Sequence, residues 1–162
     1  MPDPNSNRIV WREGAQGSSS FIRGPIEYRL LRYEGKIVRA DLQLWGSNIV
    51  AYVEVTNDNA YTIDTAHDIS VQLTLPRRDV LLPLETEQIA RLLVKQSKAN
   101  KDIAAKLRKE PWKLGPETIK GKSKWEGISY FAFRGQLADR FIKQVDLQVY
   151  FGGVAFVFPF KL

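Results

Sequence analysis

His67 is the single histidine of the chain, and Asp68 follows it directly. A histidine beside an acid is the part of a Ser-His-Asp triad that takes the proton from a nucleophile. The nearest serine, Ser70, falls in a predicted strand, and no Gly-x-Ser-x-Gly turn exposes another serine. Cysteine is absent, which excludes disulfides, thiol catalysis and thiolate metal sites. We therefore predict that the chain has no catalytic residues and is not an enzyme.

Oxygen-bearing side chains gather in the loop after Thr56. They are Asn57, Asp58, Asn59, Asp64 and Asp68. Hard oxygen ligands at close spacing suit calcium, but the spacing differs from the Asp-x-Asp-x-Asp-Gly loop and no glutamate ends it. Asn and Asp are also common in turns, because their side chains bond to the nearby backbone. We favour a turn, predict no metal site and no cofactor, and leave calcium open for this loop. One histidine without cysteine argues against zinc.

Two further chemistries fail on spacing or on pattern. The tripeptide GKS at 121–123 matches the end of a phosphate-binding loop, but the glycine required five residues earlier is Pro116. Glu54, Glu126 and Asp146 are candidates for the carboxylate pair of a glycoside hydrolase. Each of them lies on or beside a predicted strand and alternates with apolar neighbours, so we predict that they face solvent.

The strongest unusual feature is a basic segment. The chain carries a net charge of +6, and between Arg91 and Lys124 eleven Lys or Arg stand against three acids. This segment is therefore positive while the rest of the chain is slightly negative. Spacings of i, i+4 and i+7 place its first cations on one predicted helical face, and the last three lysines alternate along an extended stretch flanked by tryptophans. The predicted partner-binding residues are Arg91, Lys95, Lys98, Trp112, Lys120, Lys122, Lys124 and Trp125.

Several partners suit cations interleaved with aromatic residues. We predict a non-enzymatic binding or assembly module that contacts a protein or cell-envelope partner through the basic helix and the 112–125 segment. The alternative is a module that binds nucleic acid or an anionic surface with the same face. A solvated helix face and a lysine-protected edge strand remain open as well. Sugar stacking on Trp45, Trp112 or Trp125 is a further alternative. The sequence leaves the oligomeric state unknown.

Alternating patterns predict the strands that must position these residues. Apolar residues recur at every second position in IVRADLQLW, in IVAYVEVT and in DISVQLTLP, which is the period of a strand with one wet face. The first two follow a predicted strand at 26–33 and form an antiparallel meander with it. The last eighteen residues, VDLQVYFGGVAFVFPFKL, predict a hairpin that turns at Gly152-Gly153. Its apolar face must pack on the meander, because an isolated hairpin is marginal in water.

The pattern changes to a helical period after Thr86, a predicted cap, and this period ends before Pro111 as one long helix or two shorter ones. The predicted fold is mainly β, an immunoglobulin-like antiparallel β-sandwich with a helical insertion at about 85–110. We predict one domain over 21–162 and a flexible linker over 1–20, where the sequence is polar and rich in Pro, Asn, Gly and Ser. No apolar run approaches the ~20 residues of a membrane helix.

Four stretches occur in a characteristic order: VEVTNDN, ISVQLTL, LGPETIKGKSKWEGISYFAF and a final hairpin VDLQVYF…AFVFPF. This order resembles bacterial extracytoplasmic immunoglobulin-like domains of lipoproteins and secreted proteins, over 26–162. The resemblance implies an exported sandwich used for binding or assembly, at the periplasm or cell surface, with no catalytic residues to carry over. The polar start is typical either of a tether left after removal of a signal or anchor or of a natural disordered terminus. The chain departs by its basic helical insertion and by showing no export signal, so the cytoplasm is the alternative location.

Overall fold

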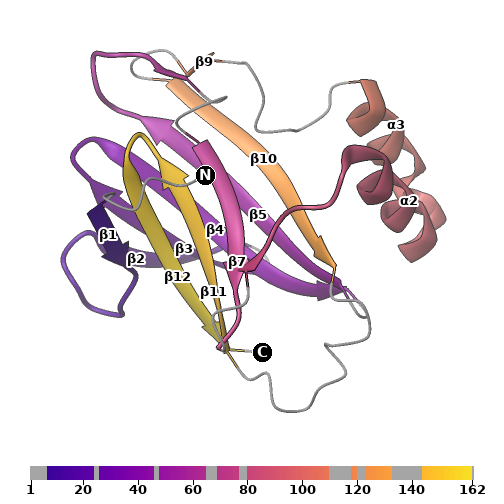
Figure 1. The fold of residues 1–162 in the computed structure, drawn as a ribbon, viewed down its shortest axis with the longest axis horizontal. Coiled ribbons are helices and arrows are strands. Elements are labelled where there is room, and N and C mark those ends of the chain that lie inside the picture. Colours follow the sequence, from indigo (N-terminus) through magenta and orange to yellow (C-terminus); the bar gives the residue numbers. More distant parts are fainter. Residues whose placement is uncertain are drawn as a thin grey trace.

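A computed structural model of the chain describes residues 7–23, 26–45, 48–64, 69–76, 80–109, 118–119, 123–132 and 144–161. The described part contains two five-stranded sheets that face each other, a small two-stranded sheet, and two α-helices at one side (Figure 1). The β-sandwich with a helical insertion that the sequence predicts is confirmed.

One sheet, here called the meander sheet, has the order β10-β5-β4-β3-β2, and its neighbouring strands are antiparallel. Its strands are β2 (Ser18–Arg23), β3 (Ile26–Tyr33), β4 (Lys36–Trp45), β5 (Asn48–Asn57) and β10 (Ser123–Ala132). The three-stranded meander predicted from alternation is β3-β4-β5. The tight turn between β3 and β4 is made by Glu34 at φ 47 and Gly35 at φ 74, which suits the right-handed twist of a hairpin.

The other sheet, here called the hairpin sheet, has the order β1-β12-β11-β7-β8. Its strands are β1 (Asn7–Val10), β7 (Ile69–Thr74), β8 (Val80–Leu81), β11 (Gln144–Phe151) and β12 (Val154–Lys161). Gly152 and Gly153 join β11 to β12 with φ values of 56 and 79, so the predicted turn is confirmed. A separate pair is formed by β6 (Ile63–Asp64) and β9 (Thr118–Ile119).

The core lies between the two sheets and is built from alternate residues of both. Phe151, Phe156 and Phe158 of the hairpin sheet are fully buried, and they belong to the same cluster as Val38 and Ile49 of the meander sheet. Each large apolar side chain buried in this way stabilises the fold by roughly 1.5–3 kcal/mol. The apolar positions expected to point inward along the final hairpin are therefore confirmed.

The linker predicted over 1–20 is wrong from Asn7 onward. Asn7–Val10 form β1, which runs parallel to β12, and Ser18 begins β2. The physical reason is the apolar island in this polar stretch: Ile9 and Trp11 pack against the core, and the Trp11 backbone N–H donates to Val157 O at 2.8 Å. Residues 1–6 lie outside the described part. A polar composition therefore concealed a short strand that two apolar residues, Ile9 and Trp11, anchor to the core.

The helical insertion consists of α2 (Thr86–Gln96), a 3₁₀ turn η1 (Lys98–Asn100) and α3 (Lys101–Lys109). The two-helix alternative is the correct one. Glu85, rather than Thr86, is the cap of α2, and its backbone N–H donates to the Gln88 side-chain oxygen at 3.1 Å. This bond satisfies a backbone donor that the first helical turn leaves without a helical partner.

The helices pack on the outer face of the meander sheet, away from the sandwich core. Val50 points outward from β5, between the inward-facing Ile49 and Ala51. It forms a second, smaller apolar cluster with residues of α2 and α3. The other buried members are Ile89, Ala90, Leu93 and Ala104. Strand β5 is thus buried on both faces at this end, which explains its nearly continuous apolar sequence.

Candidate functional site

The structure places only part of the predicted contact residues. Arg91 and Lys95 are exposed on α2, and Lys98 is exposed in η1. Lys124 and Trp125 belong to β10, but their side chains are not among those described. Trp112, Lys120 and Lys122 lie outside the described residues. Of the predicted contact surface, the structure therefore describes the side chains on the helical insertion, which are Arg91, Lys95 and Lys98.

Lys98 does not share a continuous helical face with Arg91 and Lys95, so the predicted i, i+7 arrangement is wrong. Helix α2 ends at Gln96 because Ser97 has an extended backbone, with φ −160 and ψ 136. The Ser97 hydroxyl accepts a bond from Ala99 N at 3.2 Å, and Asn100 Nδ2 donates to Leu93 O at 2.9 Å. The Ser97 side chain thus satisfies a backbone N–H in η1, and the Asn100 side chain satisfies a backbone carbonyl at the end of α2.

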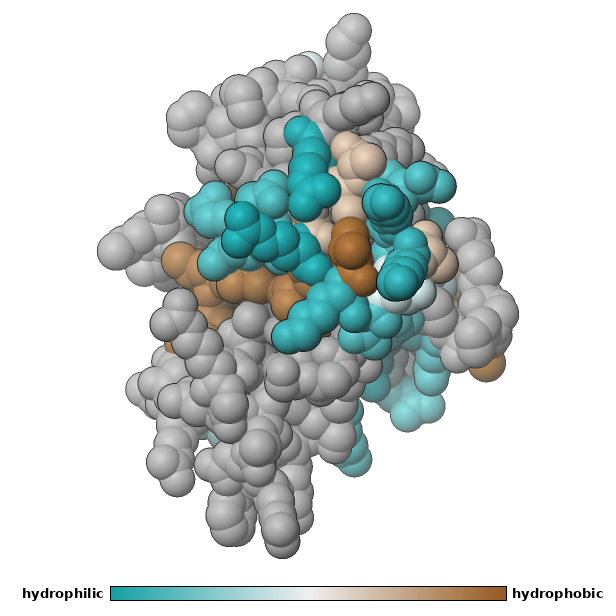
Figure 2. Space-filling model, turned by 90° about the vertical axis from the view of Figure 1, so that its right-hand side faces the viewer, coloured by the Kyte–Doolittle hydropathy of each residue, from teal (hydrophilic) through white to brown (hydrophobic). Residues whose placement is uncertain are grey.

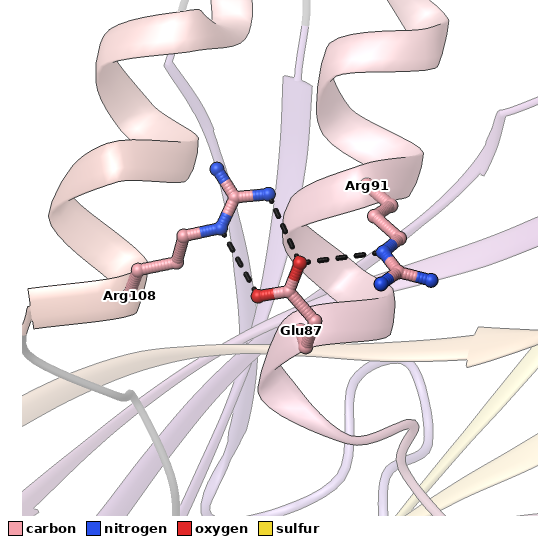
Figure 3. A network of polar contacts seen from close by, with 3 residues as sticks. All are labelled: Glu87, Arg91 and Arg108. Atoms are coloured by element: carbon pink, nitrogen blue, oxygen red, sulfur yellow. Dashed lines mark hydrogen bonds and ion pairs between the residues drawn. The ribbon is translucent and has the colours of Figure 1, made fainter.

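Glu87 joins the two helices through two arginines (Figure 3). Its Oε1 accepts from Arg91 Nε at 3.3 Å, one turn along α2. Arg108 of α3 donates through Nε to Oε2 at 3.1 Å and through Nη2 to Oε1 at 3.2 Å, a two-point contact. The hydrogen bond from Arg108 holds the pKa of Glu87 below its ordinary value, and the same bond raises the pKa of Arg108. The network fixes two exposed cations in place.

Replacing Glu87 by glutamine is expected to lower the melting temperature slightly near neutral pH, and this difference is expected to shrink as the pH falls below the unfolded-state pKa of Glu87. The pKa of Glu87 is depressed in the folded state. Its contribution is therefore complete above the unfolded-state pKa and is lost as the pH falls through the folded-state pKa. The effect is small and salt-sensitive because all three side chains are exposed. Melting curves of the wild type and E87Q between about pH 7 and pH 3 test this.

The matched control for E87Q is Glu27→Gln, which changes an exposed acid on β3 that lies outside the helical network. We expect this variant to leave the difference between neutral and acid pH as it is in the wild type. A difference between the wild type and E87Q that persisted undiminished at about pH 3 would contradict the assignment, because a protonated Glu87 no longer attracts the two arginines.

Hydrophilic side chains gather on the side of the molecule where α2 and α3 lie, around a smaller area of apolar ones (Figure 2). Lys101 is exposed at the start of α3, close along the chain to Lys98. Leu82, in the segment that leads from β8 to α2, is 70% exposed. We call the exposed side chains of this region the helical surface. It comprises Leu82, Glu87, Arg91, Lys95, Lys98, Lys101 and Arg108.

A second polar arrangement lies on the outer face of the meander sheet and was missed from the sequence. Glu54 is only 4% exposed, so its predicted solvent exposure is wrong. Arg39 Nη1 lies 3.0 Å from Glu54 Oε1, and the two residues are register partners on β4 and β5. The Arg39 guanidinium also lies over the Phe21 ring at 5.3 Å. Opposite charges at outward positions of adjacent predicted strands were the available signal.

Next to this pair the face becomes aromatic. Phe21 stacks on Tyr28 with ring centroids 5.2 Å apart, and Tyr28 meets Tyr52 edge-on at 6.0 Å. Asp41 is buried on the same face and accepts a bond from Gln43 Nε2 at 3.0 Å. Burial raises the pKa of Asp41 above its ordinary value, against the effect of that bond. On this face the rings stack on one another and the polar side chains bond to each other, so we interpret these contacts as packing within the fold.

The loop considered for calcium is built as a turn where it is described. Asn59 N donates to Asn57 Oδ1 at 3.1 Å, and Asn57 Nδ2 donates to Tyr61 O at 2.6 Å. These are the side-chain bonds that make Asn common in turns. The side chain of Asp64 and the whole of Asp68 lie outside the description, as does His67. Within the described residues, no group of three or more His, Asp or Glu is placed to hold a metal ion.

Comparisons with known proteins add little. No family model and no curated protein matches the chain. Two crystal structures are similar in shape. A conserved hypothetical protein from Bacillus anthracis has a TM-score of 0.38 at 10% identity, over 81% of this chain and 84% of that one. An uncharacterized beta-sandwich protein from Clostridium difficile 630 has a TM-score of 0.40 at 8% identity, over 99% and 98%. At these scores we draw nothing from either. In the described part, no helix has the length and apolar character needed to cross a membrane.

Proposed function

We propose that the protein is a non-enzymatic binding or assembly module and that its helical surface contacts an acidic protein partner. The observation that carries this proposal is the Glu87 network, which holds Arg91 and Arg108 in position on the exposed side of two helices. Arginines that are already ordered lose less conformational entropy when a carboxylate binds them. Arginine is also enriched at the residues that dominate protein interfaces.

The apolar part of the helical surface favours a protein over a polyanion. Leu82, in the segment that leads from β8 into α2, is 70% exposed. Phosphate backbones and lipid headgroups attract lysine and arginine but give such a leucine no matching apolar contact. A protein interface combines an apolar centre with a polar rim. Lys124 and Trp125 of β10 belong to the proposed contact region through the 112–125 segment.

We also propose that the module works at the cell envelope, as an exported immunoglobulin-like domain tethered at its N-terminus. The support for this location is the resemblance in strand order and turn sequences described above. Fractionation of the native host, with an antibody against the protein, tests the location. Recovery with the periplasmic or surface fraction is expected, and recovery with the cytosol would reject the export proposal without touching the contact surface.

Reversing two cations, Lys95→Glu with Lys98→Glu, is expected to weaken partner capture at least tenfold, because each lost attraction becomes a repulsion. A photo-crosslinking residue at the exposed position of Gln96 reports capture in the native host. We expect one defined protein to be crosslinked, and the reversed variant to lose it. The matched control reverses two exposed cations of β12 and the N-terminal segment, Arg12→Glu with Lys161→Glu, and should retain the crosslink.

The alternative of nucleic-acid or anionic-surface binding makes a different prediction in the same variants. Binding to a single-stranded oligonucleotide or to phosphatidylglycerol vesicles would fall steeply with salt concentration. Such binding, lost in the Lys95 and Lys98 variant while no protein crosslink forms, would replace the proposed function. If the control pair lost the crosslink equally, the contact would depend on net charge, and the helical surface would not be the site.

A further inference from the structure

Strand β2 forms one edge of the meander sheet, on the side of the molecule opposite to the helices (Figure 1). Within the described part, β2 pairs with β3 alone, and the pairing is antiparallel. Just before β2 begins, the Arg32 N–H donates to Gly17 O at 2.8 Å, so these two residues form a hydrogen-bonded pair of this ladder. Such pairs alternate with pairs that form no hydrogen bonds. The backbone groups of Ser18, Ser20 and Ile22 therefore point away from β3, toward the open edge.

Two residues of this edge keep both of their backbone groups open. The Ser18 N–H already donates to Ala15 O at 3.0 Å, in the turn before β2. For Ser20 and Ile22, no hydrogen bond reaches the N–H or the C=O from the open side within the described part of the chain. Both residues are exposed, and Ile22 is 76% exposed. Two donors and two acceptors of the backbone are thus available to another strand.

The sequence of this edge lacks the usual protection against pairing with another strand. Edge strands are commonly protected by Lys, by Pro, by a bulge or by an inward-pointing charge. The sequence of β2, SSSFIR, contains no proline and has one charged residue, Arg23, at its end. Its residues pair one to one with those of β3, so β2 contains no bulge. The edge is therefore able to accept a further strand.

An aromatic row on the outer face of the meander sheet ends at this edge. Phe21 lies between Ser20 and Ile22 along β2, and its side chain is on the opposite face of the sheet from theirs. It stacks on Tyr28, which meets Tyr52 edge-on. Phe21 is half-buried. A strand that pairs with β2 would place a side chain directly beside this ring.

We propose that β2 pairs antiparallel with β2 of a second copy of this chain, about a twofold axis at Phe21. In this register Ser20 of each copy lies opposite Ile22 of the other, so all the open donors and acceptors of the two residues are used. The two Phe21 residues face each other as a non-hydrogen-bonded pair, with Cα atoms about 4.5 Å apart. The aromatic rows of the two copies then join into one.

A second copy is favoured as the occupant because the open groups of β2 are complementary to themselves under twofold symmetry. Most soluble homo-oligomers are dimers with this symmetry. The two meander sheets become one continuous sheet through the β2 pair. Helices α2 and α3 pack on β5, away from this edge, so the pairing leaves both helical surfaces exposed and does not depend on them.

Sedimentation equilibrium of the purified chain, from about 10 µM to about 1 mM, tests the pairing, because a small interface predicts a weak dimer. Each copy carries a net charge of +6, so the measurement is made at about 0.15 M salt, where this repulsion is screened. Ser20→Pro removes an open N–H and is expected to weaken the dimer at least about tenfold. Proline is tolerated on an edge strand where the N–H faces solvent, so the monomer should fold, which a melting curve checks. Ser20→Ala is the matched control, and it should dimerise as the wild type does because it keeps the backbone groups.

The register is tested by a disulfide, since the chain contains no cysteine of its own. Phe21→Cys places two thiols opposite each other at the twofold axis, within the Cα spacing of about 4.4–6.8 Å that a disulfide needs. Ser19, on the same face, lies opposite Arg23 of the other copy. The two Ser19 residues are therefore roughly 13 Å apart along the strand direction, too far for a disulfide. We expect Phe21→Cys to form a disulfide-linked dimer on oxidation and Ser19→Cys to remain monomeric.

Three outcomes would overturn the proposal. The first is a chain that stays monomeric over the whole concentration range, which would leave the edge to a foreign strand or to none. The second is a dimer of undiminished affinity in the folded Ser20→Pro variant, and the third is equal crosslinking of Ser19→Cys and Phe21→Cys. A dimer that Ser20→Pro weakens and Ser20→Ala does not, crosslinked through Phe21→Cys alone, supports it. If Ser20→Pro does not fold, the two cysteine variants decide.

Discussion

Replacing Phe156 by alanine is expected to lower the free energy of unfolding by about 3–5 kcal/mol. Phe156 is fully buried on β12, in the sheet between β1 and β11, and its ring centroid lies 6.4 Å from that of Phe151. Removing the ring leaves a cavity that both sheets line, and a sandwich of two hydrogen-bonded sheets collapses little to fill it. Equilibrium unfolding in urea, followed by tryptophan fluorescence, measures the change.

A loss of that size is a large share of the 5–15 kcal/mol that stabilises a typical domain, so Phe156→Ala can fail to fold. Phe156→Leu keeps most of the volume and is expected to cost about 1–1.5 kcal/mol. Ile22→Ala is the control, because Ile22 on the edge strand β2 is 76% exposed and its truncation should change stability by less than about 0.5 kcal/mol. Equal costs for Phe156→Leu and Ile22→Ala would contradict the face-to-face packing.

The core was predictable because its signal is local. In a strand, alternate residues point to opposite faces, so the sequence of β5 already separates Ile49 and Val53 from Tyr52. The structure buries the first two in the sandwich core. The same rule placed Phe156 and Phe158 of the final hairpin correctly, since the turn at Gly152-Gly153 fixes the register of the two strands.

Non-local contacts were not predictable in this way. Nothing within β1 shows that Asn7–Val10 will run parallel to β12, because the partner lies at the other end of the chain. The break at Ser97 depends on which side chains close the end of α2, and this changed where Lys98 lies. Lys36 reads as a surface lysine beside a turn. In the structure only 5% of it is exposed, and its Nζ lies 5.8 Å from the centre of the Tyr61 ring, which is a tertiary contact.

The charged pair on the meander sheet was missed for a related reason, and it supports the second large prediction. Replacing Arg39 by methionine is expected to cost about 1–3 kcal/mol, less than a fully buried pair because Arg39 is partly exposed. The Arg39 side chain is 33% exposed and that of Glu54 is 6% exposed. Glu54 therefore has little access to water when its cation is removed. The variant also loses the contact of Arg39 with the Phe21 ring. Urea unfolding at neutral pH measures this cost.

Because Arg39 is more exposed than Glu54, we expect the two single substitutions to have unequal costs in stability, which a double-mutant cycle measures. Glu54→Met should cost less than Arg39→Met, because the remaining arginine can turn its guanidinium toward water. The double variant should be closer to the wild type than the sum of the two single costs, with a coupling of about 1–2 kcal/mol. Equal single costs with no coupling would mean that the 3.0 Å contact adds nothing to stability.

Glu126 is the register partner of Glu54 on β10, so three strands carry charged residues in one row. Like charges on adjacent strands destabilise a sheet. Arg39 offsets one of the two negative charges of this row, and that role predicts that Arg39→Lys, which keeps the charge, costs less than Arg39→Met.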